Sequence, residues 1–206
     1  MTTALGHCRL AIQDLSPDGC QPIHDMDDKI HAVVNGELYD HDRIREDLIN
    51  QHGFKFKGHS DSEIVVALYK LYGLSFLRQL RGEFALCLYD SETKFFVAAR
   101  DRYGIKPLFW TIQDGRLLIA AEAKAFLPLG WEPEWDVKSL LDGGWNHDQR
   151  TIFKNVSKVG QALVLRDSWL TITQVRPGHY LTCSSFGHIE QRQYWDVEYR
   201  DKVRSS

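Results

Sequence analysis

Two apolar segments in the middle of the chain constrain its fold most strongly. Residues 83–90 (EFALCLYD) and 95–101 (FFVAARD) each have the length of a β-strand, and the short polar stretch between them is a turn-forming sequence. This arrangement predicts a β-hairpin. The first segment is apolar at positions that face either side of a sheet, so we expect it to be a central strand.

The segments around this hairpin predict further strands and two helices. Apolar residues alternate along residues 29–35, which is the pattern of a strand. Residues 41–52 carry apolar residues at helical spacing, and residues 60–72 begin with the Ser-x-x-Glu spacing of a capping box, Ser60 and Glu63. Strands in adjacent hairpins with helices grouped between them favour an α+β fold, with antiparallel sheets covered by helices, over a βαβ alternation.

Composition excludes several classes of function. The chain has 206 residues, 43% of them apolar, which is enough for one sizeable core. A net charge of −3 with scattered basic residues gives no electrostatic case for a nucleic-acid partner. No apolar run reaches membrane-spanning length and no secretory signal is present, so we expect a cytoplasmic protein without a membrane partner. The four cysteines are far apart and the histidines lack metal-ligand spacing, so no metal site is expected.

The stretch 33–40 (VVNGELYD) allows two interpretations. An isolated Asn35-Gly36 pair is typical of a turn because both residues tolerate positive φ. A side-chain amide beside an unobstructed backbone N–H also places two hydrogen-bond donors side by side, as needed to hold a developing oxyanion.

Two charged residues are equally open to two interpretations. Arg9, on an expected strand over residues 8–12, is either a surface cation or a guanidinium offered to a carboxylate. Asp61, in the first turn of the second helix, either complements the helix dipole or holds the ammonium group of a ligand.

Several segments in fixed order resemble the glutaminase domain of glutamine-hydrolysing asparagine synthetases, a class II (type-2) glutamine amidotransferase domain. The segments are GHCRLAI, VVNGELYD, HSDSEI, LRGEFALCLYD and ARDRYGIKPLFW, followed by AAEAKAFL and RTIFK…PGHYL…YWD. The resemblance implies the four-layer αββα sandwich of N-terminal-nucleophile enzymes, with two antiparallel sheets and the first strand or strands missing. It implies L-glutamine as substrate and no cofactor in this domain, since ATP and Mg²⁺ belong to a separate synthetase domain. That domain, in cis or in trans, is the expected partner, and a homodimer is a candidate assembly.

The resemblance also implies roles for five residues. Arg9 corresponds to the residue that pairs with the α-carboxylate of glutamine, and Asp61 to the one that takes its α-ammonium group. The Asn35 amide and the Gly36 N–H correspond to the oxyanion hole. Glu37 completes the pocket with the backbone of Asn35 and Gly36.

The sequence departs from the family pattern in its nucleophile. The family's nucleophile is a cysteine at the start of the mature chain, whose own α-amine serves as base. Cys8 is internal and, on a strand, points away from Arg9. We therefore expect the 206-residue chain to be inactive in the family's asparagine synthase (glutamine-hydrolysing) reaction. The alternative is a non-catalytic scaffold, as in β-lactam synthetase-like relatives.

The resemblance to the asparagine synthetase family also divides the chain into segments. We expect residues 1–199 to form the amidotransferase domain, with an incomplete N-terminus, and residues 200–206 to be a polar tail where a synthetase domain starts. Residues 160–175 interrupt the family pattern and are either a translated intron or a genuine β-hairpin.

Overall fold

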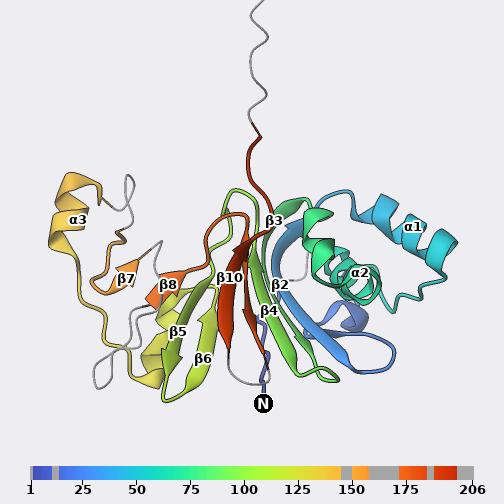
Figure 1. The fold of residues 1–206 in the computed structure, drawn as a ribbon, viewed down its shortest axis with the longest axis horizontal. Helices are drawn as coiled ribbons and strands as arrows, with labels where there is room; N and C mark the ends of the chain where they lie inside the picture. Colours follow the sequence, from blue (N-terminus) through green and yellow to red (C-terminus); the bar gives the residue numbers. More distant parts are fainter. Residues whose placement is uncertain (1, 11–13, 145–149, 158–171, 185–187, 199–206) are drawn as a thin grey trace, which may run out of the picture.

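The fold consists of two β-sheets that face each other, with helices on the outer sides (Figure 1). The computed structural model describes residues 2–10, 14–144, 150–157, 172–184 and 188–198. The larger sheet has the order β1-β2-β3-β4-β9-β10 and the smaller the order β6-β5-β8-β7. The strands are β1 (Ile23–His24), β2 (Ile30–Leu38), β3 (Gly82–Asp90), β4 (Phe95–Arg100), β5 (Phe109–Gln113), β6 (Arg116–Ala120), β7 (Val156–Ser157), β8 (Ile172–Gln174), β9 (His179–Cys183) and β10 (Ile189–Gln193).

In space the helical segments lie outside the two sheets. Along the chain they fall between groups of strands. They are α1 (His41–His52), α2 (Ile64–Tyr72) and α3 (Val137–Asp142), with 3-10 turns η1 (Pro17–Gly19), η2 (Asp61–Glu63), η3 (Gly73–Arg78) and η4 (Ala123–Leu129). Helix α1 ends at Gly53, whose left-handed backbone lets its N–H reach the carbonyls of Leu48 and Ile49. None of the helices in the described residues is long and apolar enough to cross a membrane.

Three apolar clusters separate four layers. The first lies between α1, α2 and the larger sheet, where Val34 and Leu86 meet the buried face of α2. The second lies between the sheets and contains Trp110 and Leu181. The third packs Phe126 of η4 on the outer face of the smaller sheet. The expected α+β, four-layer αββα sandwich is therefore present.

The central hairpin agrees with the sequence analysis. β3 pairs antiparallel with β2 on one side and β4 on the other, and Phe84, Leu86 and Leu88 of β3 are buried. The smaller sheet differs from the expected all-antiparallel arrangement in one pair, because β7 and β8 run parallel.

Two expected segments differ in detail. Residues 8–10 of the strand expected over 8–12 form no β-ladder, and residues 11–13 lie outside the described residues. The capping box of α2 is absent, because the chain begins this helix with the 3-10 turn η2 and the Ser60 side chain makes no capping bond. The Glu63 carboxylate instead accepts the backbone N–H groups of Lys57 and Gly58.

The proposed insertion 160–175 is described only at its end. Residues 160–171, like the tail 200–206, lie outside the described residues. Residues Ile172–Gln174 form β8, which pairs with β5 on one side and β7 on the other, and Ile172 and Thr173 are buried. The end of this segment is therefore part of the smaller sheet, while its origin and the domain boundaries stay predictions.

Candidate functional site

Asn35-Gly36 lies inside a strand and is not a turn. β2 continues through both residues to Leu38, with Asn35 opposite Ala85 and Gly36 opposite Phe84 in β3. Gly36 has φ +141°, and a Cβ there would stand 1.8 Å from the Glu83 carbonyl oxygen. Glycine is required because the two strands approach too closely for a side chain.

The hydrogen-bond pattern of β2 determines where the Gly36 N–H points. Tyr39 N–H donates to the Arg81 carbonyl, and Ser91 N–H donates to the Lys29 carbonyl. In an antiparallel pair, hydrogen-bonded positions alternate with positions whose N–H and C=O point away. Odd-numbered residues of β2 therefore bond to β3, and the Gly36 N–H points to the opposite edge.

Side chains occupy that edge on both sides of Gly36. The Gln21 amide forms hydrogen bonds with both backbone groups of Val34. Its Oε1 accepts the Val34 N–H (2.6 Å) and its Nε2 donates to the Val34 carbonyl (3.0 Å). At Leu38, the N–H donates to Oδ2 of Asp61 (2.8 Å). The Gly36 N–H lies between these two substitutes for a neighbouring strand, so the edge of β2 is open at this residue.

A cavity of about 340 Å³ opens at this point, in the size range of small-molecule pockets. All five residues singled out from the sequence line it: Arg9, Asn35, Gly36, Glu37 and Asp61. The structure thus brings together residues from the N-terminal segment, β2 and η2. Their roles in binding glutamine stay predictions.

The loop that follows Arg9 holds its guanidinium in place. The guanidinium donates to the carbonyls of Asp14 and Ser16 (3.4 Å to Ser16) and packs so closely against Gly19 that a Cβ there would lie 2.4 Å away. The loop is itself fixed by the Asp14 carboxylate, whose pKa is lowered because it accepts hydrogen bonds from Ser16 and from the His59 N–H. Arginine has five N–H donors, so donors remain for a ligand.

Asp61 is buried, with one oxygen committed to the backbone of β2. Oδ2 accepts the Leu38 N–H, while Oδ1 accepts longer bonds from the hydroxyls of Ser62 (3.2 Å) and Ser60 (3.5 Å). A hydroxyl can rotate its proton elsewhere, so Oδ1 retains capacity for a ligand's N–H. The carboxylate is held rigidly at the pocket wall.

Sequence reasoning missed several residues that also line the pocket. Lys106 is brought there by the buried Asp101, whose carboxylate accepts the N–H groups of Tyr103, Ile105 and Lys106. The Lys106 ammonium lies 3.9 Å from the Glu83 carboxylate, which also lines the pocket. The Asp-x-x-Gly pattern at residues 101–104 signals this turn, but it does not reveal where Lys106 points.

Two residues beside Arg9 complete the wall. His7 is partly buried, its Nδ1 has no hydrogen-bond partner, and burial lowers the pKa of its imidazole. Cys8 also lines the pocket, although the strand expected from the sequence pointed it away from Arg9. The orientation expected for Cys8 assumed a ladder that these residues do not form.

The architecture matches that of known amidotransferases. The glutamine phosphoribosylpyrophosphate amidotransferase from B. subtilis, solved with ADP and GMP, superimposes with a TM-score of 0.63 at 20% identity, over 92% of this chain and 34% of that one. At this identity the likeness establishes the fold alone.

Sequence comparisons establish the family. The family model described as "Glutamine amidotransferase domain" matches residues 1–195, so the chain belongs to that family. Amidase chry2 of Gibberella zeae is 52% identical over 198 residues, which cover 96% of this chain and 27% of the amidase. Asparagine synthetase B of Escherichia coli is 38% identical over 154 residues, 68% of this chain and 27% of that protein. The chain thus spans about a quarter of the length of each relative.

Proposed function

We propose that the pocket binds L-glutamine as a zwitterion and that the domain is the glutamine-binding module of a larger amidotransferase. In this arrangement Arg9 pairs with the α-carboxylate and Asp61 with the α-ammonium group. The Asn35 amide and Gly36 N–H hold the side-chain carbonyl oxygen, and Glu37 closes the pocket. The observation that carries the proposal is the open edge of β2 at Gly36, in the same cavity as the fixed Arg9 and Asp61.

The proposal does not extend to turnover by these 206 residues. Burial raises the pKa of Cys87 to about 12 and also raises that of Cys183, which disfavours the nucleophilic thiolate form of both. Cys8 and Cys20 are exposed, but each is internal and has no α-amine of its own to act as base. We expect binding of glutamine without release of ammonia.

In the whole protein, we propose that a synthetase domain uses the ammonia, in cis or in trans, for an ATP-dependent amidation of the kind asparagine synthetases perform. A homodimer is part of this proposal. The 52% identity to amidase chry2 favours a second candidate, in which the same pocket takes a carboxamide other than free glutamine.

Calorimetry with the purified chain tests the binding proposal. We expect L-glutamine to bind with millimolar or better affinity and Arg9→Ala to weaken it about 10- to 150-fold, because a hydrogen bond to a charged group contributes about 1.5–3 kcal/mol. Arg43→Ala is the matched control, since Arg43 is exposed and pairs with Asp47 on α1. L-Glutamate, glutaminamide and simple carboxamides measured in parallel distinguish the two candidates.

Two results contradict the proposal. If glutamine does not bind, or if Arg9→Ala and Arg43→Ala behave alike, the pocket is not a glutamine site and the scaffold alternative is favoured. Ammonia release from glutamine above that of a boiled sample would contradict the expected absence of turnover.

A further inference from the structure

The hairpin formed by β1 and β2 carries a cluster of potential metal ligands. Nδ1 of His24 lies 2.7 Å from Nδ1 of His31, and Oδ1 of Asp28 lies 3.5 Å and 3.8 Å from those two nitrogens. Within the part of the chain that the structure describes, this is the one such group of His, Cys, Asp or Glu residues. The sequence did not reveal this group of ligands, because His24 and His31 are neighbours across a hairpin and do not have the spacing of ligands on one helix.

The register of the hairpin brings the two imidazoles together. His24 is directly opposite His31 in the β1–β2 pair, while the next pair outward is hydrogen-bonded through the Asp25 N–H and the Ile30 carbonyl. The histidine pair is therefore a non-hydrogen-bonded pair, in which opposed side chains approach most closely. Ile23 and Ala32 point to the other face of the hairpin and are buried in the core under α2.

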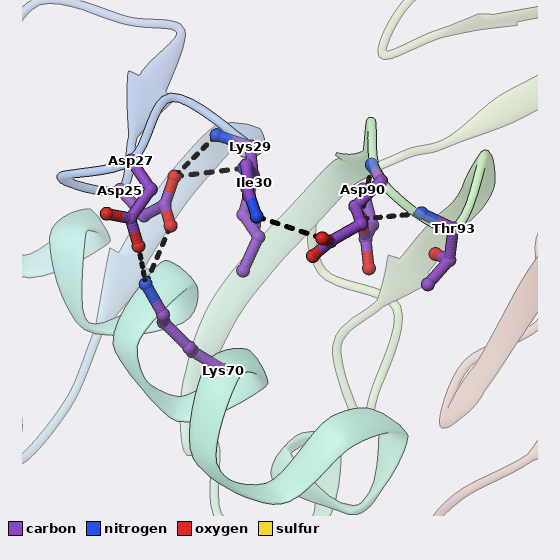
Figure 2. A network of polar contacts seen from close by, with 8 residues as sticks. Asp25, Asp27, Lys29, Ile30, Lys70, Asp90 and Thr93 are labelled. Carbon is purple, nitrogen blue, oxygen red and sulfur yellow. Dashed lines mark hydrogen bonds and ion pairs between the residues drawn. The ribbon is translucent and has the colours of Figure 1, made fainter.

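The loop that presents Asp28 is built around the Asp25 carboxylate (Figure 2). Its Oδ1 accepts the N–H groups of Lys29 (2.7 Å) and Ile30 (3.0 Å), and its Oδ2 pairs with the Lys70 ammonium of α2 (2.9 Å). Asp28 lies inside this loop with φ +55°, a left-handed conformation that aspartate tolerates better than most residues. These contacts fix the backbone on both sides of the candidate ligands, as a preorganised site requires.

We propose that His24, Asp28 and His31 bind a Zn²⁺ ion that ties the turn of the hairpin to its two strands. Two imidazole nitrogens and one carboxylate oxygen are a common ligand set of zinc, with a fourth position left for water. Zn–N bonds of about 2.0–2.1 Å at a tetrahedral angle place the nitrogens roughly 3.3 Å apart. The imidazoles must separate by about 0.6 Å from their present hydrogen-bonded contact, and the Asp28 side chain, 79% exposed, is free to follow.

The zinc site lies away from the candidate glutamine pocket. His31 and Asn35 are four residues apart on β2, a separation of roughly 14 Å along a strand, so an ion here does not touch a ligand in the glutamine pocket. The hairpin is nevertheless connected to that pocket. Gln21, just before β1, forms hydrogen bonds with both backbone groups of Val34 on β2, and both residues line the pocket. Zinc would reduce the motion of the strand that carries Asn35 and Gly36.

Zinc titration of the chelator-treated 206-residue chain tests the proposal. We expect binding of one Zn²⁺ ion, a rise in the unfolding temperature with free zinc, and shifts of the His24 and His31 ring resonances in NMR spectra. His24→Ala and His31→Ala should each weaken binding at least tenfold, since even supporting residues around a metal cost 10- to 100-fold when changed. His52→Ala, on the exposed end of α1, is the matched control and should bind as the wild type does.

A thiol site is the main competing explanation. Cys8 and Cys20 are exposed, so a Cys8→Ser/Cys20→Ser variant is titrated as well and should retain binding. If a histidine variant does not fold, Asp28→Asn replaces it, because asparagine keeps the left-handed backbone and removes only the anionic ligand; it too should bind zinc more weakly. The proposal is overturned if the wild type binds no zinc, if binding survives the ligand substitutions, or if loss of the two cysteines abolishes it.

Discussion

Gly36 shows how one residue serves both the fold and the candidate site. Its missing side chain lets β2 approach the Glu83 carbonyl, and its N–H faces the cavity at the open edge of the strand. A side chain at this position would disturb the pairing of β2 with β3 even when no ligand is bound. The effect of a substitution on stability can therefore be measured without a substrate.

We predict that Gly36→Ala destabilises the protein by about 2–5 kcal/mol, because it combines a disfavoured positive φ with a clash against backbone. Gly115→Ala is the matched control: Gly115 also has positive φ (+71°), but its Cβ would meet nothing within 4 Å. The control should lose only about 1–2 kcal/mol, the cost of the left-handed conformation. Urea unfolding of the two variants provides the comparison, and equal losses would show that the close contact with Glu83 is not rigid.

At the scale of elements, local patterns predicted much of the fold. The β3–β4 hairpin and α1 have the expected positions, because each depends on burial along a short segment. β2 and α2 overlap the expected segments, but β2 continues to Leu38 and α2 begins only at Ile64. Asn35-Gly36 was ambiguous because the feature that decides it, the approach of Glu83, is more than forty residues away in the chain.

Non-local contacts account for what the sequence did not reveal. The pairing of β4 with β9 joins residues 96–99 to residues 180–183, and no local pattern encodes it. Gln21 enters the pocket through hydrogen bonds to Val34 in another segment, and Lys106, although its turn is local, reaches the pocket beside Glu83 of β3. The same holds for the His24–His31 pair, which exists only in the folded hairpin.

The contact between the β1–β2 hairpin and α2 depends on Asp25. Burial raises the pKa of this carboxyl, but hydrogen bonds from Ile30, Lys70 and Lys29 outweigh it and the pKa is lowered overall. The folded protein therefore takes up this proton less readily than the unfolded chain. The stabilisation is fully present above the ordinary pKa of aspartate and is lost as the pH falls through the lowered value.

We predict that Asp25→Asn costs about 1.5–3 kcal/mol at pH 7, because it removes the charge that accepts two backbone N–H groups and one of the two carboxylate partners of Lys70, the other being Asp27. The difference from the wild type should shrink as the pH falls below the ordinary range of aspartate. Asp47→Asn makes the same chemical change in an exposed ion pair and should lose under about 1 kcal/mol. Urea unfolding at a series of pH values measures both, and a difference independent of pH would contradict the role given to the charge.

At the scale of the whole molecule, Arg100 joins the two sheets at one end of the sandwich. It ends β4 in the larger sheet and is 7% exposed. Its guanidinium donates to the carbonyls of Gly104 and Lys106 in the following loop, and to the Val175 carbonyl and the Gln174 side chain at the end of β8. Burial lowers the pKa of this guanidinium, but an arginine stays charged in proteins, so the carbonyl oxygens must stabilise that charge.

A lysine cannot replace this arrangement. Arg100→Lys keeps the charge but lacks the planar fork, so it leaves several buried carbonyls and part of its own charge unsatisfied. We predict a loss of about 2–5 kcal/mol in the free energy of unfolding, because each unpaired buried group costs about 1–3 kcal/mol. Arg116→Lys, in an exposed pair with Asp114, should change it by less than about 0.5 kcal/mol. Because Trp110 lies between the sheets, its fluorescence, measured in a background in which the other five tryptophans are replaced by phenylalanine, should report loosening there at lower urea than far-UV circular dichroism reports loss of the strands. Coincident transitions at wild-type stability would mean that the apolar cluster between the sheets is sufficient to hold them together.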